Sequence, residues 1–288
     1  MADTPKYSKE VVKCFIEYGE KQLAENMRYL SFDYCYGYFQ KYKKKHTKLG
    51  ENMEYSCMVL WSYLASWGML RGSSLLLQEG NYKVLEETIK VIQKCFGGEI
   101  ALPKIEDDSL EDYVEKVDNL CKEVRDSIKL DDFEPSNTLV TKIILGVFGA
   151  FPALDTNFCL AFGGGTSIRR FAEKVKKFYR DYNGLMTKEI NVENFIGAKT
   201  EDKYPVEKLI DMFGFFLGGM VQGDNCAISI KNWNGEKVYV DGEEKTVGSD
   251  GIIKVDPGEY TVEIIFDDKA PVIWKNVKVS KEKSNDGD

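Results

Sequence analysis

The spacing of apolar residues changes near Gln222-Gly223-Asp224-Asn225, and this change limits the folds open to the chain. Before it, apolar residues recur every three or four positions, as on one face of a helix. After it they alternate with polar residues in short runs, the pattern of half-buried strands. These runs are CAISIKNW, EKVYVDG, GIIKVDPG, YTVEIIFD and VIWKNVKVS, separated by the turns Asn234-Gly235, Asp241-Gly242, Asp250-Gly251 and Asp256-Pro257-Gly258. We therefore expect a multidomain α+β fold: an all-α helical domain over 1–223, a small antiparallel β-sandwich over 224–281 and a disordered tail over 282–288.

The composition excludes several classes of protein. With 43% hydrophobic residues the chain of 288 residues can form a sizeable core, and a net charge of −8 argues against a surface that coats DNA. The N-terminal residues are charged, and no apolar run reaches the length of about 18 residues that a transmembrane helix needs. We expect a cytoplasmic protein that makes no contact with a membrane.

Cysteine and histidine usage argues against metal and disulfide chemistry. The seven cysteines contain no CxxC pair and are odd in number, which is typical of free thiols in a reducing compartment. The single histidine, His46, stands in a charged run, so a histidine-based catalytic centre is disfavoured. We expect neither a metal nor a cofactor.

Helices are predicted along most of the first 221 residues. A first helix, capped by Ser8, carries apolar residues at helical spacing as far as Leu30. Others are expected over 32–46, 81–96, 109–130, 139–148, 167–182 and 205–221, while 191–204 is interpreted as a polar connection. In 32–46 the alternation of Phe32, Tyr34, Tyr36 and Tyr38 also fits a strand, but the flanking periodicity favours a helix. Residues 51–71 are apolar on nearly all sides, which predicts a buried helix. Arg71 would end this helix with either a carboxylate partner, the favoured alternative, or a ligand.

Two basic segments are candidate binding surfaces. The lysines of KYKKK (Lys41, Lys43, Lys44, Lys45) follow a tyrosine-rich run and fit either a phosphate or nucleic-acid surface or, more simply, a solvated helix end. FGGGTSIRR begins the basic helix 167–182, through which nucleic acid is a further candidate partner. Its candidate anion-binding residues are Gly163, Gly164, Gly165, Thr166, Ser167, Arg169 and Arg170, with Arg71 added from the earlier helix. The favoured alternative is a hinge with a capped helix.

The central segment resembles part of the helix-hairpin-helix DNA glycosylases. A lysine-bearing helix is followed by Phe-Gly, a proline and Asp-Thr, so the matching residues are Lys142 and Asp155. The resemblance implies a lysine nucleophile and a carboxylate that stabilises a cationic sugar. The glycine-rich hairpin of that family is absent, because SNTLVTK stands in its place. The alternative is that Asp155 caps a helix and Lys142 pairs with an acid or extends to the surface.

The C-terminal runs VYVDGEEKTVGSDG and VDPGEYTVEI resemble the PEGA and carboxypeptidase-regulatory-like β-sandwich modules over residues 238–264. The resemblance implies a binding or spacer module without catalytic activity. Together with the absence of a recognisable catalytic constellation, it favours a binding protein for a protein partner or an anionic, phosphate-containing ligand. A setting in phage–host conflict fits such a protein. The alternative is a glycosylase-like enzyme that uses Lys142 and Asp155.

Overall fold

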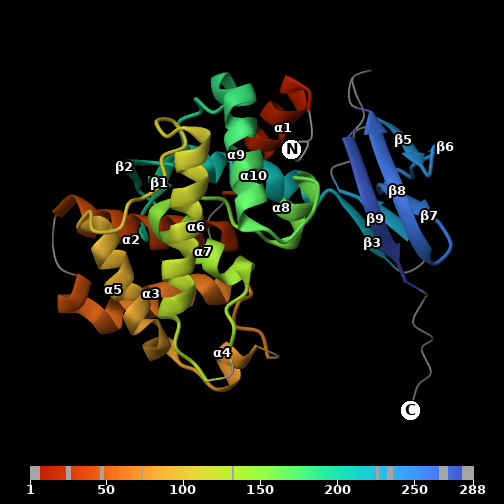
Figure 1. The fold of residues 1–288 in the computed structure, drawn as a ribbon. Coiled ribbons are helices and arrows are strands. Elements are labelled where there is room, and N and C mark those ends of the chain that lie inside the picture. The colour runs from red at the N-terminus through yellow and green to blue at the C-terminus, as the bar shows by residue number, and fades with distance from the viewer. Residues whose placement is uncertain are drawn as a thin grey trace, which may run out of the picture. The chain divides into compact units, whose positions relative to one another are not determined.

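The structure is a computed structural model of the chain, and it describes residues 7–23, 27–45, 49–72, 74–131, 133–224, 227–231, 236–265 and 272–280. It is 53% helical and 17% strand, with antiparallel sheets, so the predicted α+β class is confirmed (Figure 1). His46, Cys226 and the predicted tail over 282–288 lie outside the described residues. Among the described helices, none has both the length and the apolar character needed to cross a bilayer.

Contacts divide the chain into two compact units. Unit 1 comprises Met1–Asp3, Tyr18–Leu154 and Thr166–Asp211, and unit 2 comprises Thr4–Glu17, Asp155–Gly165 and Met212–Asp288. Two helices, α1 (Lys9–Lys21) and α10 (Val206–Gly218), contribute residues to both units. The domain boundary expected at residue 223 and the β-sandwich both stay predictions.

Unit 1 is helical apart from one small hairpin. Its elements are η1 (Arg28–Leu30), α2 (Ser31–Lys45), η2 (Leu49–Asn52), α3 (Met53–Ser66), α4 (Leu75–Gln78), η3 (Tyr82–Leu85), α5 (Glu86–Phe96), α6 (Leu110–Ser127), α7 (Asn137–Phe148), α9 (Ile168–Tyr182), η4 (Asn183–Leu185), β1 (Asn191–Glu193) and β2 (Lys199–Lys203). Serine side chains cap the starts of three of these helices. The side chains of Ser109, Ser136 and Ser167 accept hydrogen bonds from the backbone N–H groups of Asp112, Leu139 and Arg170.

Helix α7 is the centre of unit 1, as its apolar sequence predicts. All its residues from Leu139 to Phe148 are buried, and it packs against α2, α3 and α6. Gly146 permits the close approach to α3, because a Cβ atom there would lie 2.3 Å from the Tyr63 ring. Gly149 ends α7 with a φ of 63°, the left-handed conformation that favours glycine.

Three charged residues of α10 are buried in unit 1: Glu207, Lys208 and Asp211. The Lys208 ammonium lies 2.9 Å from the Asp211 carboxylate, whose other oxygen accepts the backbone N–H of Ala153 at 3.0 Å. Glu207 forms no ion pair with a described residue, although the charge of Lys176 acts on it. Burial, opposed by backbone hydrogen bonds, raises the pKa of Glu207 to about 8.

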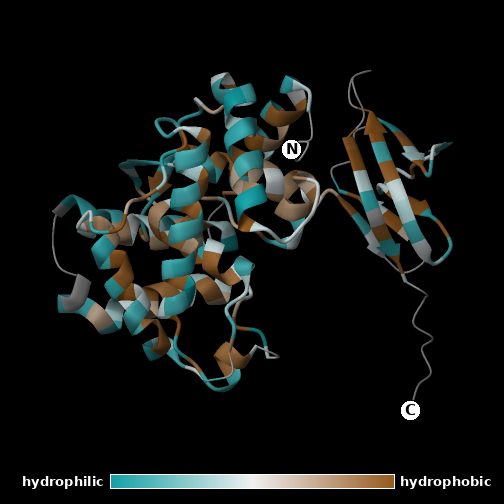
Figure 2. Cartoon of the chain, in the orientation of Figure 1, coloured by the Kyte–Doolittle hydropathy of each residue, from teal (hydrophilic) through white to brown (hydrophobic). Residues whose placement is uncertain are grey.

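The described residues of unit 2 combine part of α1 and α10 with α8 (Thr156–Ala161) and seven strands. These strands are β3 (Val221–Asp224), β4 (Ala227–Ile230), β5 (Lys237–Val240), β6 (Glu243–Lys245), β7 (Ile252–Lys254), β8 (Gly258–Ile265) and β9 (Val272–Val279). They form antiparallel sheets of order β3-β4-β7 and β6-β5-β8-β9. Apolar and polar residues alternate along them, as Figure 2 shows on β8 and β9. The Trp274 indole N–H donates to the Leu217 carbonyl oxygen at 3.3 Å, which fastens β9 to the end of α10.

The structure corrects three sequence-based expectations. The first helix ends at Lys21 instead of extending to Leu30. Residues 191–204, interpreted as a polar connection, contain the β1–β2 hairpin. The helix expected over 51–71 ends at Ser66 and is buried on one side only, because Tyr55 and Met58 remain 58% and 44% exposed. An apolar sequence therefore covers both faces of α3, although only one face packs on the core.

The close contact of Gly146 predicts an unusual response to alanine. In most helix interiors Gly→Ala adds up to about 1 kcal/mol of stability. Here Gly146→Ala should lower the free energy of unfolding by about 1–3 kcal/mol, because its Cβ would overlap Tyr63. In the matched control, Gly37→Ala in α2, the new Cβ would meet Val192 Cγ1 at 3.4 Å, and stability should rise. Urea unfolding measures both, and a stabilising Gly146→Ala would contradict the packing.

The buried Glu207 predicts a pH dependence of stability. Its folded-state pKa is raised, so between pH 5 and 8 the folded protein holds a proton that the unfolded chain has lost. Unfolding free energy should therefore fall as pH rises through this range, by up to about 1.4 kcal/mol per pH unit. Glu207→Gln should flatten the profile, most clearly between pH 6 and 8. Equal slopes for both proteins in urea titrations would refute the assignment.

Candidate functional site: a tyrosine-lined cleft

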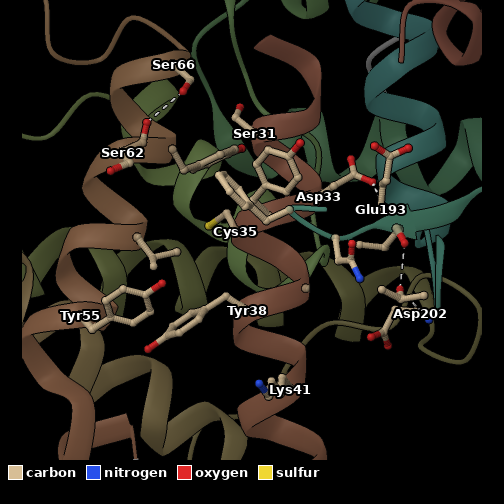
Figure 3. Close-up of a pocket in the computed structure, with 18 of the residues that line it drawn as sticks. Ser31, Asp33, Cys35, Tyr38, Lys41, Tyr55, Ser62, Ser66, Glu193 and Asp202 are labelled. Carbon is tan, nitrogen blue, oxygen red and sulfur yellow. Dashed lines mark hydrogen bonds between the residues drawn. The ribbon is translucent and has the colours of Figure 1, made fainter. Parts of the chain in front are cut away.

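A cleft of about 770 Å³ opens in unit 1 between α2, α3 and the β1–β2 hairpin (Figure 3). We call it the tyrosine cleft, because Tyr34 and Tyr38 of α2 and Tyr55 and Tyr63 of α3 line it. The hairpin supplies the third wall with residues that include Val192, Glu193 and Phe195. Figure 3 shows Tyr38 and Tyr55 directed toward one another between the two helices.

The outer face of α3 gives the cleft its apolar wall. Cys57, Leu60 and Leu64 are buried on the inner face, while Tyr55 and Met58 remain available on the outer face. Serine hydroxyls on the cleft side add little polarity, because each is bonded to its own helix: Ser62 Oγ donates to the Met58 carbonyl at 2.8 Å, and Ser66 Oγ donates to the Ser62 carbonyl at 3.0 Å. Their small size leaves room beside the tyrosines.

The aromatic rings of the cleft hold one another in place. Tyr38 and Tyr55 meet edge to face with ring centroids 5.4 Å apart, and Tyr34 meets Phe195 in the same manner at 5.7 Å. The hydroxyl groups of Tyr38 and Ser56 are 2.8 Å apart and share a hydrogen bond. The walls are therefore fixed by contacts between helices and between helix and hairpin.

Asp33 fastens the hairpin wall to α2. Its Oδ1 accepts the backbone N–H of Glu193 at 2.8 Å, and its Oδ2 accepts the Tyr204 hydroxyl in a short hydrogen bond. The carboxyl group is almost fully buried. Burial raises its pKa to about 6, while the bonds from Tyr204 and Glu193 and the charge of Lys208 oppose that rise. The Glu193 carboxylate raises the pKa further, so the two carboxyl groups are neighbours at one edge of the cleft.

The hairpin turn projects two apolar side chains into solvent. Asn194 Oδ1 accepts the backbone N–H groups of Ile196 and Ala198, at 3.1 and 3.0 Å, and Gly197 takes a φ of 78°. This compact turn leaves Phe195 and Ile196 86% and 84% exposed. Phe195 lines the cleft, so its exposed ring adds apolar surface at the rim.

The charged groups of the cleft differ in whether they have partners. Lys44 and Asp202 form an ion pair at 2.5 Å, which bridges α2 and β2. Lys41 and Glu193 form no ion pair with any residue that the structure describes. Among the residues that the structure describes, no group of three or more His, Cys, Asp or Glu side chains is placed to hold a metal ion.

The predicted anion-binding residues are divided between the two units. Gly163, Gly164 and Gly165, with φ values of 78°, 69° and 114°, form a turn in unit 2. Thr166, Ser167, Arg169 and Arg170 belong to unit 1, where Ser167 and Arg169 line a second, polar hollow. Arg169 is paired there with Asp118 at 2.9 Å, and the Thr166 carbonyl accepts from Asn137 at 2.7 Å. Anion binding stays a prediction.

Arg71 lies at the surface, against the expectation that it ends a buried helix. Its Nε donates to the Gly68 carbonyl oxygen at 2.8 Å. The helix ends at Ser66, five residues earlier, so the guanidinium is not carried into the core. It lines neither the tyrosine cleft nor the polar hollow.

The two residues of the glycosylase resemblance have structural contacts of their own. The Lys142 ammonium lies 4.6 Å from the centre of the Trp67 ring within unit 1. Asp155, in unit 2, accepts the backbone N–H of Phe158 at 3.0 Å and caps α8, as the alternative interpretation expects. The two residues belong to different units, and the glycosylase hypothesis stays a prediction.

Removal of the Asp33 carboxylate should loosen the hairpin wall. Asp33→Ala leaves the Glu193 N–H and the Tyr204 hydroxyl without their acceptor, which should lower stability by about 1–3 kcal/mol. Hydrogen exchange at Glu193 should accelerate more than exchange in α7. Asp33→Asn keeps an oxygen for the Glu193 N–H and should have the smaller effect. Unchanged exchange at Glu193 in Asp33→Ala would contradict this role.

Comparisons with known proteins do not assign a function to this cleft. The PEGA-like and glycosylase-like resemblances, which rest on short stretches of sequence, gain no support from them. No family model matches the chain, and no match was found among curated proteins or among solved structures.

Proposed function

We propose that this chain is a binding protein whose recognition site is the tyrosine cleft. The observation that carries the proposal is the outer face of α3, which is apolar where a surface helix is normally polar and which lines a preformed cavity of about 770 Å³. Small-molecule sites are typically clefts of about 300–1,000 Å³ with mainly apolar walls and a few polar groups. The tyrosine cleft has this character.

The chemistry of the lining residues supports binding over covalent catalysis. Cys35 lies on the cleft wall, but burial raises its thiol pKa far above the usual range, so the nucleophilic thiolate is not formed near neutral pH. Both carboxylate oxygens of Asp33 already accept hydrogen bonds from protein groups, so neither is available to act on a substrate. Tyrosines, in contrast, give a large contact area at low conformational cost and suit recognition.

The sequence-based hypotheses are compatible with this proposal. A β-sandwich formed by the C-terminal sheets would be a second binding or spacer module, supported by the close approach of β3 and β9 at Gly223, where a Cβ would meet the Lys278 carbonyl oxygen at 1.8 Å. Anion recognition at Ser167 and Arg169 has weaker support, since Arg169 is already paired with Asp118. A cytoplasmic location remains part of the proposal.

Filling the cleft tests the proposed function. Ser62→Trp places an indole in the cavity without removing a core side chain, and Ala65→Trp adds the same group to an exposed, non-lining position of α3. In a fragment screen followed by NMR, fragments should perturb residues of α2, α3 and the hairpin, and Ser62→Trp alone should abolish these shifts. If the fragments bind elsewhere, or bind both variants equally, the cleft is not the recognition site. If the ligand is a protein that binds at the rim of the cleft, Ser62→Trp should abolish its binding and Ala65→Trp should not.

A further inference from the structure

The lining of the tyrosine cleft carries an excess of negative charge. Its ionisable acids are Asp33, Glu193 and Asp202, and its bases are Lys41 and Lys44. Lys44 is paired with Asp202, so these two charges offset one another. Asp33 and Glu193 remain as neighbours at one edge, whereas the ammonium of Lys41 is exposed to solvent on α2.

The aromatic walls, like the carboxylates, favour a bound cation. The π faces of tyrosine and phenylalanine rings attract cations, most strongly when the cation is removed from water. Tyr34 of α2 and Phe195 of the hairpin turn, two residues after Glu193, both line the cleft. An ammonium group bound over the face of either ring would gain from the ring as well as from the carboxylate.

One further polar atom of the cleft is unsatisfied. Ser31 lines the cavity, and its hydroxyl oxygen is buried with no hydrogen-bond partner among the residues that the structure describes. Buried hydroxyl groups are normally hydrogen-bonded, and an orphan of this kind calls for a partner.

We propose that the tyrosine cleft recognises an organic cation: a small molecule with an apolar, preferably aromatic body and a single ammonium group. This inference rests on the proposed function of the cleft and names the class of its ligand. The apolar body packs against Tyr38, Tyr55 and Met58, which line the cleft. The ammonium lies beside the Glu193 carboxylate. Asp33, whose two oxygens already accept hydrogen bonds from the protein, contributes only the field of its charge. The net charge of −8 on the chain adds a weak long-range attraction for cations.

Three probes with one common body separate charge from shape: 1-naphthylmethylammonium, 1-naphthalenemethanol and 1-naphthoate. Their dissociation constants for the intact chain can be measured by NMR titration at pH 7. The ammonium probe should bind about three- to tenfold more tightly than the alcohol, and the carboxylate most weakly. Added salt should weaken only the ammonium probe.

Substitutions at the edge of the cleft assign this preference to its residues. Glu193→Gln should weaken the ammonium probe by about three- to tenfold and leave the alcohol unchanged. Glu201→Gln, on an exposed position of the same hairpin that does not line the cleft, changes the net charge equally and should have no such effect. Lys41→Gln should tighten the ammonium probe. Circular dichroism confirms that each variant is folded.

The outcomes separate the two proposals. If none of the probes perturbs the cleft, or if Ser62→Trp leaves their affinities unchanged, the cleft is not a recognition site and the proposed function fails. If the probes bind in the cleft but the alcohol equals the ammonium, or the carboxylate is tightest, the cleft function stands and the cation inference is wrong. If Glu193→Gln and Glu201→Gln behave alike, the preference comes from the general charge of the chain, and the role of Glu193 is overturned.

Discussion

The carboxyl group of Asp33 is the contact on which the proposed site depends. From one helix it accepts hydrogen bonds from two separate segments, at Glu193 and at Tyr204, and it does so in the interior, where such bonds are strong and their loss is costly. The hairpin needs such attachment, because its own two strands are too short to be stable alone. The Lys44–Asp202 ion pair and the Tyr34–Phe195 ring contact also hold it to α2, and Asp33 is the buried part of this attachment.

The same unit tolerates several other ionisable groups in its interior, and each is accommodated by a different means. Lys208 and Asp211 are paired, Lys142 lies against the face of Trp67, and Glu207 responds to burial by a raised pKa. Lys142 belongs to α7 itself, whose other buried side chains are mostly apolar, and the other three residues belong to α10. The core of unit 1 therefore combines the hydrophobic burial of α7 with ionisable groups on both helices.

Much of the fold was predictable because its signals are local. The cap at Ser167 and the change of period near Gln222 depend only on nearby residues, and each is found where the sequence predicts it. The cleft was not predictable in the same way. The sequence pointed to the tyrosines and lysines after residue 32. The exposed face of α3, however, has the same apolar pattern in the sequence as a buried face.

The hairpin wall was missed for a related reason. Its strands are short and rich in charge, so residues 191–204 resemble a loop more than a strand pair. The signal that could have revealed it is the turn Asn194-Phe195-Ile196-Gly197, in which asparagine and glycine bracket two exposed apolar residues. What holds it in place, Asp33, lies some 160 residues away in the chain, and no local pattern records such a distance.

The division of the chain into units has a consequence for its synthesis. Unit 2 draws on Thr4–Glu17, Asp155–Gly165 and Met212–Asp288, so its first segment leaves the ribosome long before the others. Val11, Val12 and Phe15 are buried in the finished protein, and Phe15 packs against Phe213. During translation some 200 residues separate Phe15 from its aromatic partner Phe213, so the apolar face of α1 is exposed to solvent and to chaperones until that partner is synthesised.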